Sequence, residues 1–498
     1  MSTTQKPARL PRAKGSANDP NASKARSKSK ARTKPGKNPR RSGLRIANPN
    51  AAGIDIGSRE HFAAVPEGRA EKNVRSFSAY TGGLDEMAVW LKECGVTTVA
   101  MESTGVYWIA PFQVLEAAGL EVLLVDPAKV KHVPGRKSDV IDCQWLQQLH
   151  TYGLLSGAFR PPDEICRLRA LQRHRKGMVE NAAMLVQHMQ KALDQMNVHL
   201  HHVLSSITGE SGLRMLDAIL AGERDPKVLA RMADRRVRKS APEIEAALKG
   251  DFRPEHLFVL GQTLAHYRHV QQLIEACDQS LLVQLEATST RPPARKLSAP
   301  AEKQSKQKKA ARVGLRQAKP KRKPRTQQEQ RWLDQIIRIA GVDLTQVPGL
   351  GALALLTILS EIGTNMSKWR NEKAFASWLG LCPNNKISGG RILSSRTRPV
   401  ICRTADILRM AASTLGKTDT PLGAFYRRKR AQLGGPKATT ATARKLACLI
   451  YRLLRDQEPY KAETAERYEL NFQQQNLSRL RKRANKLGYD IVELQQAA

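Results

Sequence analysis

The chain has 498 residues and a formal net charge of +38, and 41% of its residues are hydrophobic. At about 100–200 residues per domain, this length predicts two to four domains. No run of eighteen apolar residues occurs, which argues against a transmembrane helix. The seven cysteines are scattered and form no CxxC pair, which argues against a disulfide framework or a structural zinc site and fits a reducing cytoplasm.

Two segments carry most of the excess positive charge. Residues 1–45 hold 14 Lys and Arg against Asp19 alone, and residues 291–325 hold 14 against Glu302 alone. Both are rich in Pro, Ala, Ser and Lys and poor in large apolar residues, which predicts disorder for the leader (1–49) and the linker (291–330). Such segments bind polyanions through phosphate contacts without sequence preference, although a solubilising tail is the alternative. We favour nucleic acid because the remaining chain is also basic.

Residues 50–160 alternate between strand and helix patterns. "AAGIDIG" and "HFAAVP" predict a strand, a turn and a second strand, and "VTTVAME" and "LEVLLVDP" predict two further strands. Between them, "GLDEMAVWLKECG" and "VYWIAPFQVLEAAG" predict helices ended by glycine. This alternation predicts an α/β domain with a largely parallel sheet.

The rest of the chain is predicted to be mostly helical. Apolar residues recur near heptad spacing at 165–200 and 257–281, which predicts an antiparallel coiled-coil arm with a smaller helical insert, together 161–290. A compact module follows at 331–456 and contains "VPGLGALALLTILSEIG", whose Pro-Gly-Leu-Gly turn is typical of a helix-hairpin-helix. The amides of such a turn can face a phosphate, although similar turns occur in proteins that do not bind DNA. Residues 457–498 predict a helical tail.

Four acids fall on three consecutive α/β elements. Asp55 lies in the first strand between two glycines, whose small size would let a ligand approach closely. Glu102 ends the strand "VTTVAME", at the sheet edge where ligands of α/β domains collect. Asp139 and Asp142 share one face if "SDVIDCQWL" is helical, and Ser138 would cap that helix.

Each acid alone has a purely structural interpretation: an acceptor for turn amides, an ion pair with Arg or Lys, or a solvated helix face. Together they suggest a two-metal site, because Mg²⁺, with Mn²⁺ as the alternative ion, prefers carboxylate oxygens and retains waters for phosphate. Two such ions would stabilise the entering and leaving oxygens of a phosphodiester attack.

The motifs resemble a known family. "GIDIG", "MESTGVYW" and "KSDVIDCQWL", in this order, are similar to the RuvC-like, RNase H-type domain of the DEDD transposases of the bacterial IS110 family, which includes the IS1111 subgroup. "ITGESGLRMLDAILAGERDP" and "LCPNNKISGGR" resemble its middle and C-terminal regions, so the likeness spans about 50–454 with the basic linker as an interruption. The resemblance implies that Asp55, Glu102, Asp139 and Asp142 are the catalytic, metal-binding acids.

Ser388 is the candidate nucleophile. It precedes a Gly-Gly pair in "NNKISGGRILSSRTRP", which predicts a sharp turn with an exposed hydroxyl, although a flexible polar loop is the alternative. Neighbouring cations could stabilise a phosphate, namely Lys386, Arg391 and Arg396. The family resemblance implies that Ser388 attacks DNA, forms a phosphoserine link and joins the four acids in a composite site, which a dimer could assemble.

The resemblance further implies a transposase or recombinase that mobilises an insertion sequence. Its expected partners are DNA and a structured bridge RNA, with a homodimer or homotetramer as the assembly, no membrane contact, and a bacterial cytoplasmic, nucleoid-associated location. Two rivals stay open: a Holliday-junction-type nuclease that uses water, and a noncatalytic nucleic-acid-binding remnant. The presence of all four acids argues against the remnant.

Overall fold

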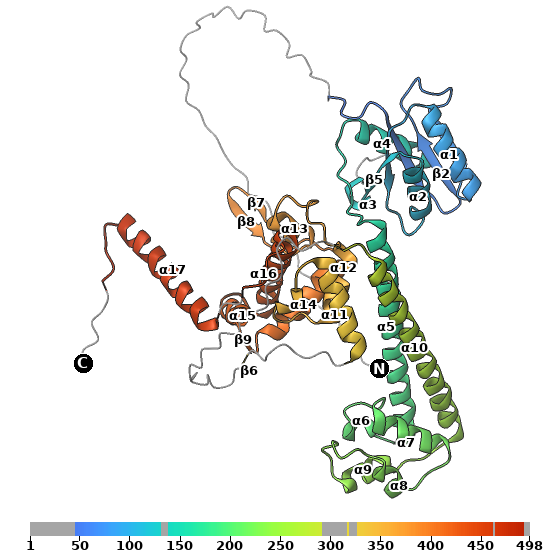
Figure 1. Ribbon diagram of the computed structural model, residues 1–498, viewed down its shortest axis with the longest axis vertical. Coiled ribbons are helices and arrows are strands. Elements are labelled where there is room, and N and C mark those ends of the chain that lie inside the picture. Colours follow the sequence, from blue (N-terminus) through green and yellow to red (C-terminus); the bar gives the residue numbers. More distant parts are fainter. Residues whose placement is uncertain (1–44, 131–137, 291–315, 318–325, 462–463, 493–498) are drawn as a thin grey trace, which may run out of the picture. The chain divides into compact units, whose positions relative to one another are not determined.

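The computed structural model describes residues 45–130, 138–290, 316–317, 326–461 and 464–492 (Figure 1). They divide into two compact units, the first ending at Phe159. No helix within these ranges is long and apolar enough to cross a bilayer. Nearly all of the two basic segments lies outside the described residues, so their disorder stays a prediction.

The first unit contains one five-stranded sheet in the order β3-β2-β1-β4-β5. The strands are β1 (Ala51–Ile56), β2 (Glu60–Ala64), β3 (Val74–Ser78), β4 (Thr98–Glu102) and β5 (Glu121–Val125). β1, β2 and β3 pair antiparallel, whereas β1, β4 and β5 pair parallel. The predicted largely parallel sheet is therefore wrong. The sheet is mixed because a short turn after Ile56 reverses the chain directly into β2, and only antiparallel strands can be joined so tightly.

Helices cover both faces of this sheet. They are α1 (Thr81–Glu93), α2 (Ile109–Ala117), the short α3 (Pro127–Val130) and α4 (Asp139–Thr151). α1 and α2 bury apolar side chains such as Met87 and Leu115 against Ile54 and Met101 of the sheet. α4 packs against β1. The unit is consistent with the predicted RNase H-like fold, and α2 begins three residues later than "VYWIAPFQVLEAAG" suggested.

A pair of long helices begins the second unit. α5 (Asp163–Gln195) and α10 (Pro254–Ala287) lie side by side in opposite directions (Figure 1), with Ala182 and Leu185 packed against Val270 and Ile274. Four short helices between them form a separate apolar core, namely α6 (Leu200–Val203), α7 (Glu210–Leu220), α8 (Pro226–Arg231) and α9 (Ala241–Leu248). The long pair and its insert follow the predicted order, and coiled-coil supercoiling stays a prediction.

The remainder of the second unit is mostly helical, as predicted. Its helices are α11 (Gln327–Ala340), the 3₁₀ turn η1 (Leu344–Gln346), α12 (Ala352–Ile362), α13 (Glu372–Trp378), α14 (Arg403–Leu415), α15 (Pro421–Leu433), α16 (Gly435–Asp456) and α17 (Ala465–Lys486). Its strands are β6 (Arg316–Gln317), β7 (Lys386–Ser388), β8 (Arg391–Ser394) and β9 (Thr418–Asp419). α12 packs on α5, where Gln172 Nε2 donates to Thr357 Oγ1 at 3.0 Å and Arg173 pairs with Glu361 at 2.8 Å. The long helices are therefore anchored to this module.

Candidate active site

Asp55 and Glu102 lie at the same edge of the sheet. β1 and β4 run parallel, with Ile54 opposite Met101, so the next residue on each strand continues the same register. Side chains alternate along a strand, and both acids therefore project to the face opposite to that of Ile54 and Met101. Glu102 Oε1 accepts a hydrogen bond from Thr104 Oγ1 at 3.2 Å.

Gly53 lets α4 approach that face closely. A Cβ at this position would lie 2.2 Å from the backbone nitrogen of Gln147 and 2.4 Å from the carbonyl oxygen of Cys143. Gln147 Nε2 also donates to the carbonyl oxygen of Ala51 at 3.3 Å. The sequence interpretation, that glycine makes room here for a ligand, is thus wrong: Gly53 makes room for the backbone of a helix. Gly57 serves the turn, since a Cβ there would meet the carbonyl oxygen of Glu60 at 2.4 Å.

This contact sets the position of the other two acids. Asp139 and Asp142 occupy the first turn of α4, N-terminal to Cys143. Ser138 caps the helix as predicted, with its hydroxyl accepting from the backbone N–H of Ile141 at 3.3 Å. The positive end of a helix favours nearby negative charge by about 0.3–1 kcal/mol, and both carboxylates lie at that end.

Electrostatics link all four acids. The pKa of Asp55 is raised from 3.8 to about 6, first by burial and then by the charges of Asp139, Asp142 and Glu102, against a hydrogen bond from the backbone of Ile56. The structure therefore brings three carboxylates near enough to act on a fourth. No ion pair among the described residues involves any of them, so the structural interpretation of Glu102 as a partner of Arg or Lys finds no support.

The donor chemistry fits a hard divalent cation, because all four side chains offer carboxylate oxygens and their mutual repulsion would be relieved by positive charge. The side chains are not yet gathered as ligands: within the described ranges, no three His, Cys, Asp or Glu residues are close enough to hold an ion together. The acids thus converge electrostatically, and closing them around a metal needs side-chain movement.

Ser388 lies in the second unit, at the tip of a tight hairpin. β7 and β8 pair antiparallel with Ser388 opposite Arg391, and the intervening Gly389 and Gly390 have φ of 54° and 74°. Two consecutive positive φ values define the type I′ turn, which matches strand twist and strongly favours glycine. Ser388 is exposed, as expected, but on an ordered strand end and not on a flexible loop.

Next to the turn, the two faces of the hairpin carry different side chains. Ile387 pairs with Ile392, and these side chains are 62% and 60% exposed. Arg391 is paired with Ser388 and therefore shares its face, and Lys386 lies two residues before Ser388 on β7, where the register of the pair shifts. Neither cation forms an ion pair with another described residue, which leaves both charges available to a phosphate. Arg396 follows the hairpin, and its carbonyl oxygen accepts from the backbone N–H of Asn384 at 2.9 Å.

The Pro-Gly-Leu-Gly turn has the expected geometry. Gly349 has φ of 88°, and the backbone N–H of Leu350 donates to the carbonyl oxygen of Val347 at 3.4 Å, as in a type II turn with Pro348 at its second position. α12 then begins without a side-chain cap at Gly351. Its first amides are compatible with a phosphate contact, which stays a prediction.

Two parts of the chain match transposase family models. Residues 52–198 match the DEDD transposase model of IS110 elements, described as a transposase. Residues 343–427 match a model described as the transposase IS116/IS110/IS902 family. The first match contains the four acids and the second contains Ser388. No curated protein matches the chain.

Proposed function

The chain belongs to the IS110 family of transposases, and on that premise we propose that it moves a DNA element by direct attack of Ser388 on a DNA phosphodiester. As a family member it is a DNA-cutting and DNA-rejoining enzyme with DNA as its partner. The observation that carries the finer proposal is the convergence of Glu102, Asp139 and Asp142 on Asp55, whose pKa they raise. Such clustering of like charges is typical of metal-dependent active sites.

Asp55, Glu102, Asp139 and Asp142 would hold Mg²⁺ or Mn²⁺. When bound, the metal supplies charge stabilisation to the oxygens that enter and leave the phosphorus. With a pKa of about 6, Asp55 is mostly ionised at pH 7 and competent as a ligand. Asp139 and Asp142 bring two more anionic oxygens from a helix end that is held against β1 by the close contact at Gly53.

Ser388 would form the covalent intermediate. Its Oγ bonds to the phosphorus while one phosphorus–sugar oxygen bond breaks, and the proton lost by the serine balances the proton gained by the leaving sugar hydroxyl. A second strand's hydroxyl then attacks the phosphoserine and releases the serine, so rejoining needs no ATP. Arg391, which is paired with Ser388, and Lys386 on the same hairpin would orient the phosphate.

A structured guide RNA completes the proposal. With sequence choice delegated to base pairing, the protein needs only to bind backbone and shape. The net charge of +38, concentrated in residues 1–45 and 291–325, supports a polyanion partner of this kind. A homodimer or homotetramer would allow the acids of one subunit to act with the serine of another.

The test compares Ser388→Ala with Ser395→Ala on labelled DNA that carries an element end. Both serines belong to the same polar segment, so the control removes an equivalent hydroxyl. Ser388→Ala should abolish the protein–DNA adduct seen on denaturing gels and reduce strand cleavage by at least about 10³-fold, as expected for loss of a nucleophile. Undiminished cleavage without an adduct would instead support the water-using nuclease. If Asp55→Ala leaves recombination unchanged, the acids have no catalytic role.

A further inference from the structure

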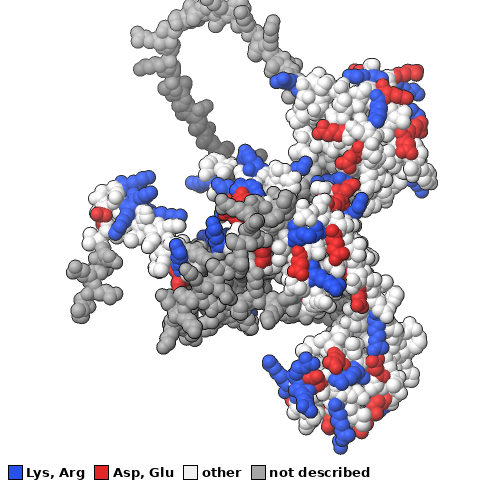
Figure 2. All heavy atoms as spheres, viewed as in Figure 1, with Lys and Arg blue, Asp and Glu red and all other residues white. Residues whose placement is uncertain are grey.

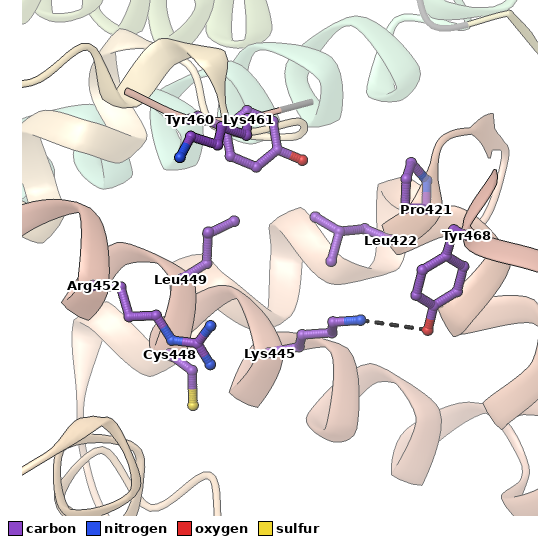
Figure 3. A pocket seen from close by; sticks show the side chains of 9 residues that line it. All are labelled: Pro421, Leu422, Lys445, Cys448, Leu449, Arg452, Tyr460, Lys461 and Tyr468. Atoms are coloured by element: carbon purple, nitrogen blue, oxygen red, sulfur yellow. Dashed lines mark hydrogen bonds between the residues drawn. The ribbon is translucent and has the colours of Figure 1, made fainter. Parts of the chain in front are cut away.

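The start of α17 is fixed to the body of the second unit. Arg428 Nη2 and Lys445 Nζ both donate to the hydroxyl of Tyr468, at 2.9 Å and 3.4 Å. The Arg428 guanidinium also lies 3.5 Å from the centre of the Phe472 ring. Figure 3 shows Tyr468 and Lys445 joined at the edge of a pocket that is also lined by Arg452. The first two turns therefore have partners within the chain.

A different face of α17 carries a leucine stripe. Its positions repeat at the a and d spacing of a heptad and are Leu470, Gln473, Leu477, Leu480, Ala484 and Leu487. The four leucines are 42–67% exposed, and among the described helices only α15 contacts α17 extensively. An apolar a/d stripe of this kind is the seam of a two-stranded helix pair, and no described part of the chain covers it.

The charges of α17 are strongly polarised along its length. Its basic end consists of Arg479, Arg481, Lys482, Arg483 and Lys486, with no acid among them, and Figure 2 shows Lys and Arg gathered there. The N-terminal end instead carries Glu466 and Glu469 beside Arg467. Two parallel copies would align their basic ends and repel, whereas two antiparallel copies place each basic end beside the other's acids and separate the clusters by roughly 20 Å at 1.5 Å per residue.

We propose that α17 pairs antiparallel with α17 of a second copy of this chain. With the two helices fully overlapped, Leu470 packs against Leu480 of the other copy, and Leu477 against its Gln473. In the same register the basic end of each helix lies beside the N-terminal end of the other copy, so the apolar stripe and the polarised charge agree on one alignment. This interface lies outside both regions that match the transposase family models and does not depend on the chemistry of Ser388.

The experiment places the photocrosslinking residue benzoylphenylalanine at position 484 of the full chain, after nuclease treatment. Light and heavy isotope-labelled copies are mixed, so that interchain products are recognised by mass. Antiparallel pairing predicts crosslinks to the other copy's residues 466–469, which trypsin separates from residues 484–486. Crosslinks to residues 484–487 of the other copy would show parallel pairing and overturn the proposal.

Two variants with equal added charge test the face. Leu477→Glu with Leu480→Glu should lower the interchain yield at least about tenfold, because the seam is lost. Gln475→Glu with Ser478→Glu adds the same charge on the opposite face and should leave the yield within about twofold. If neither pair of substitutions changes the interchain yield, the stripe is not a self-association seam. If interchain crosslinking appears only when RNA or DNA is added, α17 is a nucleic-acid contact and the proposal is overturned.

Discussion

Asp55→Asn should stabilise the N-terminal sheet at neutral pH while removing one of the proposed metal ligands. In the folded chain the pKa of Asp55 is raised from 3.8 to about 6 by burial and by three neighbouring carboxylates. The folded state therefore binds this proton more tightly than the unfolded chain does. The contribution of Asp55 to the free energy of unfolding is therefore most favourable below pH about 4, and it is lost as the pH rises through 6. Asparagine has nearly the same shape as aspartate but no charge, so the variant does not lose stability when the pH rises.

The size of the effect follows from the shift. Moving the pKa from 3.8 to about 6 corresponds to about 3 kcal/mol at 1.4 kcal/mol per pH unit. Asp55 is only half-buried, so solvent screening reduces this value. We expect the variant to gain about 1–2 kcal/mol in the free energy of local unfolding at pH 7.5, and close to nothing at pH 3.5, where Asp55 is mostly protonated in both the folded and the unfolded wild type.

Hydrogen exchange of the full chain, followed by mass spectrometry, measures this region separately from the second unit. Peptides from β1 and α4 should exchange about 5–30-fold more slowly in the variant at pH 7.5, after correction for intrinsic rates. Asp85→Asn is the control, because Asp85 is an exposed carboxylate on α1 of the same unit. Millimolar Mg²⁺ should reduce the difference in exchange rate between the variant and the wild type, because it should stabilise only the wild type. Equal protection of variant and wild type at pH 7.5, or an equal gain at both pH values, would refute the reasoning.

Two further substitutions test contacts that hold the fold together. Gly53→Ala should lower the stability of the fold by about 1–3 kcal/mol and reduce metal-dependent cleavage, because its Cβ would lie 2.2 Å from the backbone of α4. The control Gly82→Ala, where nothing lies within 4 Å, should leave the stability measured by thermal unfolding unchanged or raise it. Equal losses of stability in the two variants would contradict the role of the contact at Gly53. Asp278→Ala should destabilise the α5–α10 pair by about 3 kcal/mol, because it leaves the largely covered Arg175 without its ion-pair partner. The control Glu180→Ala removes an exposed ion pair with Lys176 and should cost under about 0.5 kcal/mol in urea unfolding. Similar costs for the two variants would show that burial is not decisive.

The sequence predicted most elements of the first unit because their apolar periodicity is strong. It missed β3, in which Phe77 is the only buried side chain, so that no alternation marks the strand. It also missed the β7–β8 hairpin, although a Gly-Gly pair between Ile387 and Ile392 is a recognised two-residue turn signal. The polar composition of that segment outweighed the signal, and the exposed isoleucines do not resemble a core.

The four acids could be predicted as a set because local patterns place them: two near strand ends and two at a capped helix start. What the sequence could not provide was the reason that α4 meets β1 where it does. A Cβ on Gly53 would lie 2.2 Å from the backbone nitrogen of Gln147. These two residues are about 90 positions apart in the chain, so no local sequence pattern reveals that they meet. Ser388 and the acids lie in different compact units, so no local pattern contains their relative arrangement either.

The acid cluster is difficult to explain as a stabilising feature. Elsewhere in the chain, carboxylates have basic partners that lower their pKa: Arg452 does so for Glu372, and Arg236 for Asp234. With 83 Lys and Arg available against 45 acids, such partners are easy to supply. Asp55 shows the opposite behaviour: burial raises its pKa, and its charged neighbours are three further carboxylates that raise it too. A chain this basic gains nothing in stability by concentrating its negative charge at one sheet edge. The arrangement is what we expect of side chains kept for a cation, because only a bound positive charge turns their mutual repulsion into a favourable interaction.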